Sequence, residues 1–401
     1  MPDFEVRAPM FHPLQSDEDV PHEALMAARA RAALAWGGLQ GRLAHITPEV
    51  AHHFCCGLVR LAAVEALTQS GFPGGDVWFS LWFSGIEPVP GVTTHAAAPA
   101  SLVAETLLCE LSLSHWGPLA EAASQIQAAA RFDPGAQRAV PALSPGFAVE
   151  EAARLAEQLE NAPARDDWPL IALDRLHGAA AGSQHFAPTE RERQLLDLPS
   201  GPVVLEQRMP GMPLWALDLV AGPLIARSNP GVRPLPCPGI VRAEALRPEL
   251  WPRERAVLVA DAACNAAQRL NKLINAAHSA VEAMAEPISG LRSTSRAPVL
   301  YRILAGFGPM RPVQIEKALA VSKNGVRDLV AALVKAGLAE MTSHRYQAVV
   351  RATPPPRLAA PAAVRADQGE AVPDSTFAQF DAAMADIDRL LARSKTPIPG
   401  E

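Results

Sequence analysis

Apolar residues recur every three to four positions along most of the chain, the spacing that places them on one face of an α helix. The clearest start signal is Thr47 before Pro48, because threonine caps a helix and proline fits its first position. The helix that they open is expected to end near Ser70. Further helices are predicted at 22–36, 99–114, 117–131, 147–161, 189–196 and 253–285. The pattern therefore predicts a mainly α fold with a multi-helix body.

Three places in the body interrupt this pattern. Gly37 and Gly38 are expected to end the first helix, because glycine is a poor helix former. Residues 78–86 are apolar, but the run is too short for periodicity to distinguish helix from strand. Residues 198–250 are broken by prolines, so irregular structure is expected there.

Residues 289–351 have the pattern of a winged helix-turn-helix. A first helix is expected to end at Gly306 and a second to start at Pro312. Ser322 is placed to cap a third helix, where its hydroxyl can accept from a free backbone N–H group. Apolar residues at i, i+3, i+4, i+7 and i+8 of that helix predict a continuous buried stripe: Val326, Leu329, Val330, Leu333 and Val334.

The opposite side of the third helix is polar and basic. Asn and Arg side chains match the edges of bases, and Lys and Arg neutralise phosphates. Gly337 is expected to end the helix, and strands at 338–341 and 346–349 would form the wing. The residues expected to contact DNA are Arg311, Ser322, Lys323, Asn324, Arg327, Lys335, His344 and Arg345.

Charge is distributed unevenly. The whole chain carries a net −6, which alone argues against a nucleic-acid partner. Residues 291–351, however, hold ten basic and three acidic side chains, a net +7, which leaves −13 on the remainder. A basic module on an acidic body favours double-stranded DNA as the partner, bound by a homodimer because two half-sites add affinity.

The C-terminal pattern also resembles a known family. The run GLRSTSRAPVL at 290–300, the run LAEMT at 338–342 and the pair Arg345 and Tyr346 are similar to motifs of soil-alphaproteobacterial, often plasmid-borne proteins. The run DVWFSLW at 76–82 is faintly similar to an N-terminal stretch of that family. In these proteins a helical domain of unknown function precedes a helix-turn-helix DNA-binding domain. The resemblance implies a DNA-binding regulator with no catalytic residues, although the third helix and the long tail differ from the family pattern.

Other reactive residues give weaker signals. His52, His53, Cys55 and Cys56 fit no standard zinc spacing, so buried helix cysteines are the simpler interpretation. An acid–base set would need a nucleophile or pocket beside it, and solvated helix charges explain these residues better: Asp166, Asp167, Asp174 and His177. The helix-turn-helix is similar to one found in Fic-type AMP transferases, but their His-Pro-Phe-x-Asp-Gly-Asn signature is absent. No enzyme activity, cofactor or metal is therefore expected.

Five cysteines without a CxxC pair fit a reducing cytoplasm. No run of ~18 apolar residues is expected to span a membrane. The protein is therefore expected in the cytoplasm, with no membrane partner.

Five regions are expected along the chain. They are a disordered arm (1–22), a helical domain (23–288), the winged helix-turn-helix (289–351), a Pro/Ala-rich linker (352–373) and an amphipathic tail helix (374–393). The tail stripe of Phe377, Phe380, Met384, Ile387 and Leu391 would pair with a copy of itself or dock on the body. The function expected is sequence-specific DNA binding and transcriptional regulation. The alternative is a ligand-sensing or enzymatic body whose winged helix serves protein docking.

Overall fold

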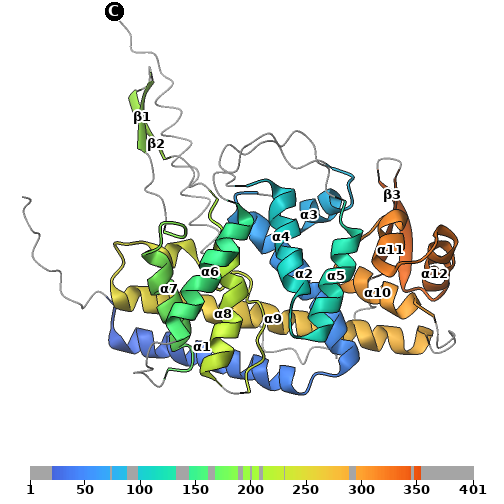
Figure 1. Ribbon diagram of the computed structural model, residues 1–401, viewed down its shortest axis with the longest axis horizontal. Coiled ribbons are helices and arrows are strands. Elements are labelled where there is room, and N and C mark those ends of the chain that lie inside the picture. The colour runs from blue at the N-terminus through green and yellow to red at the C-terminus, as the bar shows by residue number, and fades with distance from the viewer. Residues whose placement is uncertain are drawn as a thin grey trace, which may run out of the picture. The chain divides into compact units, whose positions relative to one another are not determined.

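A computed structural model describes most of the chain. The described residues are 20–72, 75–87, 98–131, 144–160, 168–187, 193–198, 201–206, 211–229, 231–288, 295–344 and 347–353. Within these ranges the fold is mainly α, with two small antiparallel hairpins (Figure 1). Nearly all of the expected arm, the linker beyond Thr353 and the tail helix at 374–393 lie outside the described residues.

The helical body comprises the described residues from 20 to 288. Its helices are α1 (His22–Ala44), α2 (Pro48–Gln69), α3 (Gly75–Phe83), α4 (Ala100–Ser112), α5 (Gly117–Ala129), α6 (Pro145–Glu160), α7 (Ile171–Ala181), α8 (Leu214–Ser228) and α9 (Pro252–Ile288). A 3₁₀ turn, Ala243–Leu246, precedes α9, and a hairpin of β1 (Arg193–Leu198) and β2 (Gly201–Glu206) lies between α7 and α8.

Helix α2 lies at the centre of the body and contacts α4, α5, α8 and α9. It begins as predicted, since the Thr47 side chain accepts a hydrogen bond from Val50 N at 3.4 Å. Among the described helices, α2 alone is long and apolar enough to cross a membrane, contrary to the expectation that no such segment exists. Most of this segment is buried inside the protein, as in the core helix of a globular fold.

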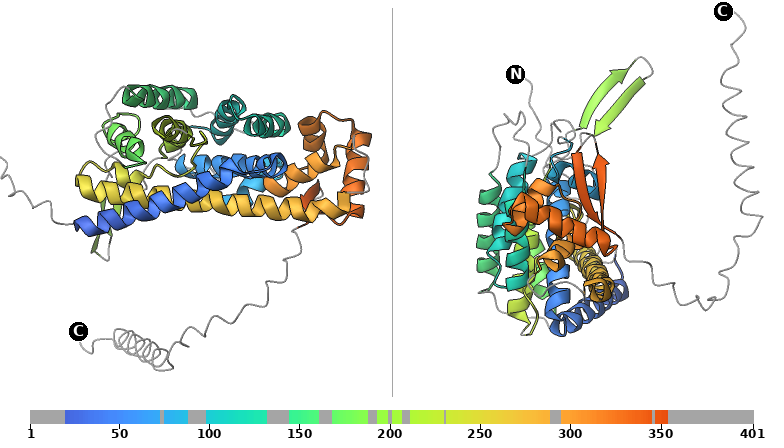
Figure 2. Two further views of the ribbon diagram at one scale, coloured as in Figure 1. Left: turned by 90° about the horizontal axis from the view of Figure 1, so that it is seen from below. Right: turned by 90° about the vertical axis from the view of Figure 1, so that its right-hand side faces the viewer.

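Helices α1 and α9 run side by side in the same direction (Figure 2). Arg31 pairs with Asp261 at 3.1 Å, and further along α1 Arg42 donates to the side chain of Asn275 at 2.7 Å. The expectation that glycines end α1 at Trp36 was wrong, because the helix continues to Ala44. Its buried Leu39 and Leu43 extend the contact with α9 and outweigh the weak helix propensity of glycine.

Three further local predictions are settled by long-range contacts. Residues 75–83 are helical, which decides the ambiguous apolar run. The predicted helix at 189–196 was wrong, because Arg193–Leu198 pairs as a strand with Gly201–Glu206. The irregular stretch contains a helix, Leu214–Ser228, with Pro223 inside it. Burial of the first turn of this helix in the core outweighs the free energy that Pro223 costs it.

The C-terminal module comprises residues 295–344 and 347–353. It contains α10 (Ala297–Gly306), α11 (Pro312–Leu319), α12 (Lys323–Lys335), β3 (Ala339–His344) and β4 (Gln347–Ala352). Body and module belong to one compact unit, because α10 packs on α2 and α9 while α11 packs on α5. Figure 1 shows α12 at the end of this unit, away from α7.

Candidate nucleic-acid interface

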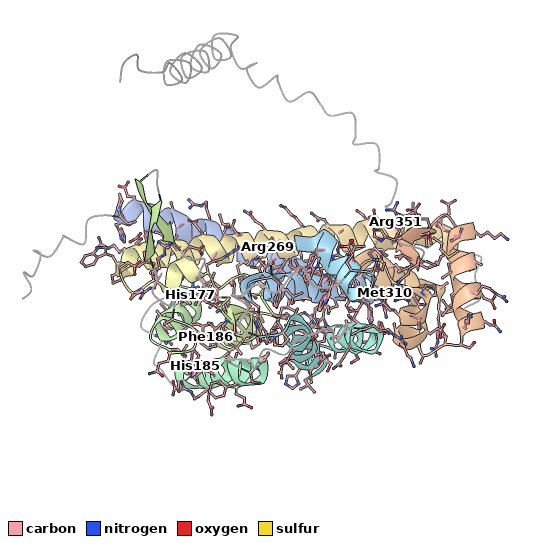
Figure 3. All side chains as sticks on the ribbon, turned by 90° about the horizontal axis from the view of Figure 1, so that it is seen from above. His177, His185, Phe186, Arg269, Met310 and Arg351 are labelled. Atoms are coloured by element: carbon pink, nitrogen blue, oxygen red, sulfur yellow. The ribbon has the colours of Figure 1, made fainter. Side chains whose placement is uncertain are left out.

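A one-residue backbone bridge pairs the segment between α10 and α11 with the hairpin. Met310, between α10 and α11, exchanges two backbone hydrogen bonds with Val350 of β4, of 3.0 and 2.8 Å. Both residues are fully buried, and Figure 3 shows Met310 near Arg351. The order of elements is therefore helix, bridge, helix, helix and hairpin. The sequence does not predict this bridge, because a single paired residue leaves no repeating pattern of apolar positions.

The turn between α11 and α12 is tight and well capped. Ala320 has φ of 48°, the left-handed region that alanine adopts at some energetic cost. Val321 N donates to Glu316 O at 3.1 Å, which satisfies a carbonyl at the end of α11. The Ser322 hydroxyl then accepts from Gly325 N at 3.2 Å, as the sequence predicted. These contacts fix where α12 starts.

Replacing Ser322 by alanine is expected to lower the free energy of unfolding by about 1 kcal/mol, the usual effect of losing a helix cap. Asparagine at this position can accept the same hydrogen bond, so Ser322→Asn serves as the control and should stay close to the wild type. Urea unfolding monitored by circular dichroism measures the stability of both variants. An unchanged Ser322→Ala variant would show that the hydroxyl does not stabilise α12.

Helix α12 has a narrow buried face and a wide exposed one. Val326, Val330 and Leu333 are buried as predicted, but Leu329 is only half-buried and Val334 is 45% exposed. The predicted continuous apolar stripe was therefore too wide, because the module has no element covering that side of the helix. The solvent side carries the polar residues expected there: Lys323, Asn324, Arg327, Asp328 and Lys335.

Much of the basic charge of the module is engaged in contacts with protein groups. Arg296 donates to Leu319 O, and Arg351 pairs with Glu340. Arg302 pairs with Glu121 of α5 at 2.7 Å. Arg296 and Arg351 are exposed to solvent although they make these contacts. The other exposed basic residues of the described module lie on α11 and α12: Lys317, Lys323, Arg327 and Lys335. The net charge of +7 thus overstates the charge available to a partner, which is concentrated on these two helices.

The predicted contact residues do not all lie together. Ser322, Lys323, Asn324 and Arg327 come together at the start of α12, with Lys335 at its end. Arg327 is 77% exposed, and its nearest carboxylate is that of Asp328 at 3.8 Å, also well exposed. The structure places Arg311 apart from them, at the start of α11, where its Nη1 donates to Ser84 O at 3.4 Å. His344 ends β3 half-buried, and Arg345 lies outside the described residues.

A buried glutamine fastens the module to the body. Gln314 of α11 is fully buried, and its Nε2 donates to the carbonyls of Phe83 at 2.8 Å and Ala129 at 3.2 Å. Its Oε1 accepts from Arg311 N at 2.9 Å. Every polar group of this side chain is thereby paired between two body helices and the start of α11. The sequence gives no sign of this role for Gln314, because a polar residue on a short helix is expected to face solvent.

A close helix crossing completes the attachment. A Cβ atom at Gly306 of α10 would lie 2.6 Å from Cys56 Cβ and 2.9 Å from His53 O of α2. Phe307 packs edge-on against Phe79 and Phe83, with ring centroids 5.7 and 4.6 Å apart. Backbone and aromatic contacts of this kind resist sliding, so the module is held in one orientation on the body.

The histidine and cysteine residues of α2 lie at this seam. His52 contacts Glu121 at 3.1 Å, while Cys55 and Cys56 are buried. Burial raises the pKa of the Cys56 thiol to about 12, so it stays protonated and unreactive. Among the described residues no group of histidines, cysteines and carboxylates could hold a metal ion.

His53 should make stability depend on pH. Burial lowers its pKa to about 4 from 6.5, and Arg302 and His52 act in the same direction. The unfolded chain therefore takes up this proton at higher pH than the folded chain, so stability falls as the pH drops from 6.5 towards 4. In His53→Gln, the slope over this window should be shallower by up to about 1.4 kcal/mol per pH unit. Urea unfolding at several pH values measures both slopes, and equal slopes would contradict the assignment.

The acid–base candidates of the body have structural partners. Asp174 pairs with Arg29 at 2.9 Å, and His177 is fully buried with its Nδ1 2.9 Å from Leu173 O. Burial lowers the pKa of His177 to about 4. The predicted neighbours Asp166 and Asp167 lie outside the described residues. Figure 3 shows His177 at the other end of the unit from Met310.

Asp218 of α8 is a buried carboxyl that sequence analysis did not single out. It accepts hydrogen bonds from the backbone N of Gly239 at 2.5 Å and of Val241 at 2.9 Å, and from Gln69 Nε2 at 3.0 Å. Burial raises its pKa to about 7 despite these bonds. Its contacts tie the segment after α8 to α2 and α8, which is a structural role.

An apolar groove of about 480 Å³ lies between the corner of α4 and α5 and helices α6 and α8. Its walls include Leu113, Trp116, Val149 and Pro223. This volume lies within the range of small-molecule sites. The ionisable residues that line it are Glu110, His115 and Arg227.

Comparison with known proteins finds no family model that matches the chain and no curated protein similar to it.

Proposed function

We propose that the protein binds double-stranded DNA and regulates transcription, with the C-terminal module acting as a winged helix-turn-helix. The observation that carries this proposal is the solvent face of α12, where Lys323, Asn324 and Arg327 are all exposed in its first two turns. A recognition helix contacts bases through its N-terminal residues, and Asn and Arg are well suited to adenine and guanine.

The arrangement around α12 supports the same use. The helix order, the tight capped turn and the hairpin joined through Met310 are features expected of a winged helix-turn-helix, and they support this proposal. Body contacts involve α10 and α11 and leave the polar face of α12 exposed. Two copies of the chain would read two half-sites, which raises both affinity and specificity.

The second candidate is a protein-docking role for the module. Val334 of α12 is 45% exposed and Met341 of β3 is 61% exposed, on elements that pack together. A partner protein would cover these apolar side chains. Replacing both by serine separates the candidates, because DNA binding through Arg327 should persist in that variant.

Selection of bound duplexes from a pool of genomic fragments tests the proposal. The full chain should enrich fragments that share a common sequence, and a variant with Lys323, Asn324 and Arg327 all changed to alanine should not. A pool that stays unenriched at low salt would overturn sequence-specific DNA binding.

A further inference from the structure

The end of helix α5 places a body arginine beside the module. Gln314 of α11 donates to Ala129 O at 3.2 Å, which fastens this end to α11. Two residues later Arg131 is exposed to solvent. Gly85 lies in the turn after α3. A Cβ atom added to it would be 3.6 Å from both Arg131 O and Arg311 Nη1. The backbone of Arg131 and the guanidinium of Arg311 therefore border the same turn of the body.

Neither arginine has a carboxylate partner within 4 Å among the described residues. The one hydrogen bond from the Arg311 side chain goes to a backbone carbonyl, that of Ser84. Around Arg131, the exposed residues on the last turns of α5 are uncharged: Ser124, Gln127 and Ala128. Elsewhere in the body, arginines such as Arg29 and Arg269 face carboxylates. Two arginines that border the same turn, neither paired with a carboxylate among the described residues, form a surface suited to an anion.

We propose that Arg131 and Arg311 together bind the phosphate backbone of the DNA, so that the body forms part of the interface. This inference rests on the proposed function. In a helix-turn-helix, the helix before the recognition helix crosses the DNA backbone. Here that helix is α11, which begins directly after Arg311 and is held against the end of α5. Phosphate contacts position the duplex without reading its sequence.

The test uses the full chain with a selected duplex and an unrelated duplex of equal length. Arg131→Gln is expected to weaken binding to both about 3- to 10-fold near 0.1 M salt. The slope of log K against log salt should become less negative by about 0.9, the effect of losing one phosphate contact. Arg131→Lys keeps the charge and should keep most of the affinity and the slope.

Arg247→Gln provides a matched control. Arg247 is exposed and its carbonyl accepts from Arg255 at 3.1 Å, near the start of α9. That helix has 37 residues, about 55 Å, and its other end leads into the module. The Arg247→Gln variant should match the wild type in both its affinity for DNA and its salt slope. If the wild type binds DNA and Arg131→Gln behaves like Arg247→Gln, the body does not contact the backbone. If the wild type itself binds no duplex, the proposed function fails instead.

Discussion

Replacing Arg327 by alanine is expected to lower affinity for a selected DNA site by about 5- to 150-fold, the effect of losing a bidentate contact to one base. The side chain is 77% exposed on the second turn of α12, and its ion pair with Asp328 at 3.8 Å is weak because water screens both side chains. Affinity for unrelated DNA should fall far less, because a base contact is lost rather than a phosphate contact.

Lys335→Ala is the control for this prediction. Lys335 ends α12, where a cation is expected to contact phosphate rather than bases, so binding to all sequences should be weakened alike. The same uniform loss is expected for Arg345→Ala, which lies in the sequence between β3 and β4. Competition binding with selected and unrelated duplexes measures both effects. If Arg327→Ala weakened both duplexes equally, Arg327 would be a phosphate contact and α12 would not read sequence through it.

Replacing Gly306 by alanine is expected to destabilise the protein by about 1–3 kcal/mol. The new Cβ atom would overlap Cys56 Cβ and His53 O of α2, neither of which is the free end of a flexible side chain. Helix α10 would have to move away from the body. The expected change in stability is opposite in sign to the usual one, because alanine in place of glycine ordinarily stabilises a helix by about 1 kcal/mol.

Gly41→Ala supplies the matched control for this second variant. A Cβ atom at Gly41 of α1 meets nothing within 4 Å, so this change should stabilise the protein slightly. Urea unfolding of the two variants should give shifts of opposite sign. A Gly306→Ala variant as stable as Gly41→Ala would mean that α10 and α2 do not cross closely.

Local signals predicted the elements that carry the proposed interface. Pro312, Ser322 and Gly337 mark helix ends through backbone chemistry that acts within a few residues, and the structure has helix ends at each of them. The polar face of α12 likewise follows from helical spacing alone. The hairpin lies close to its predicted place for the same reason.

What the sequence did not reveal depends on contacts between distant segments. The Met310 bridge joins residues 40 positions apart, and Gln314 reaches carbonyls of α3 and α5. Residues 193–196, predicted to be helical, form part of a strand because they pair with β2, Gly201–Glu206.

The attachment of the module to the body determines which form of the protein suits binding experiments. A fragment of 289–351 would expose Phe307 and Gln314 to water, so binding is best measured on the full chain.

Salt dependence of duplex binding by the full chain tests DNA binding most directly. Three exposed lysines on α11 and α12, with Arg131, Arg311 and Arg345, predict that log K falls linearly with log salt, with a slope of about −4 to −6. The variant with Lys323, Asn324 and Arg327 changed to alanine should show weaker binding and a shallower slope. Absence of binding at low salt, or binding that is insensitive to both salt and these substitutions, would contradict the account.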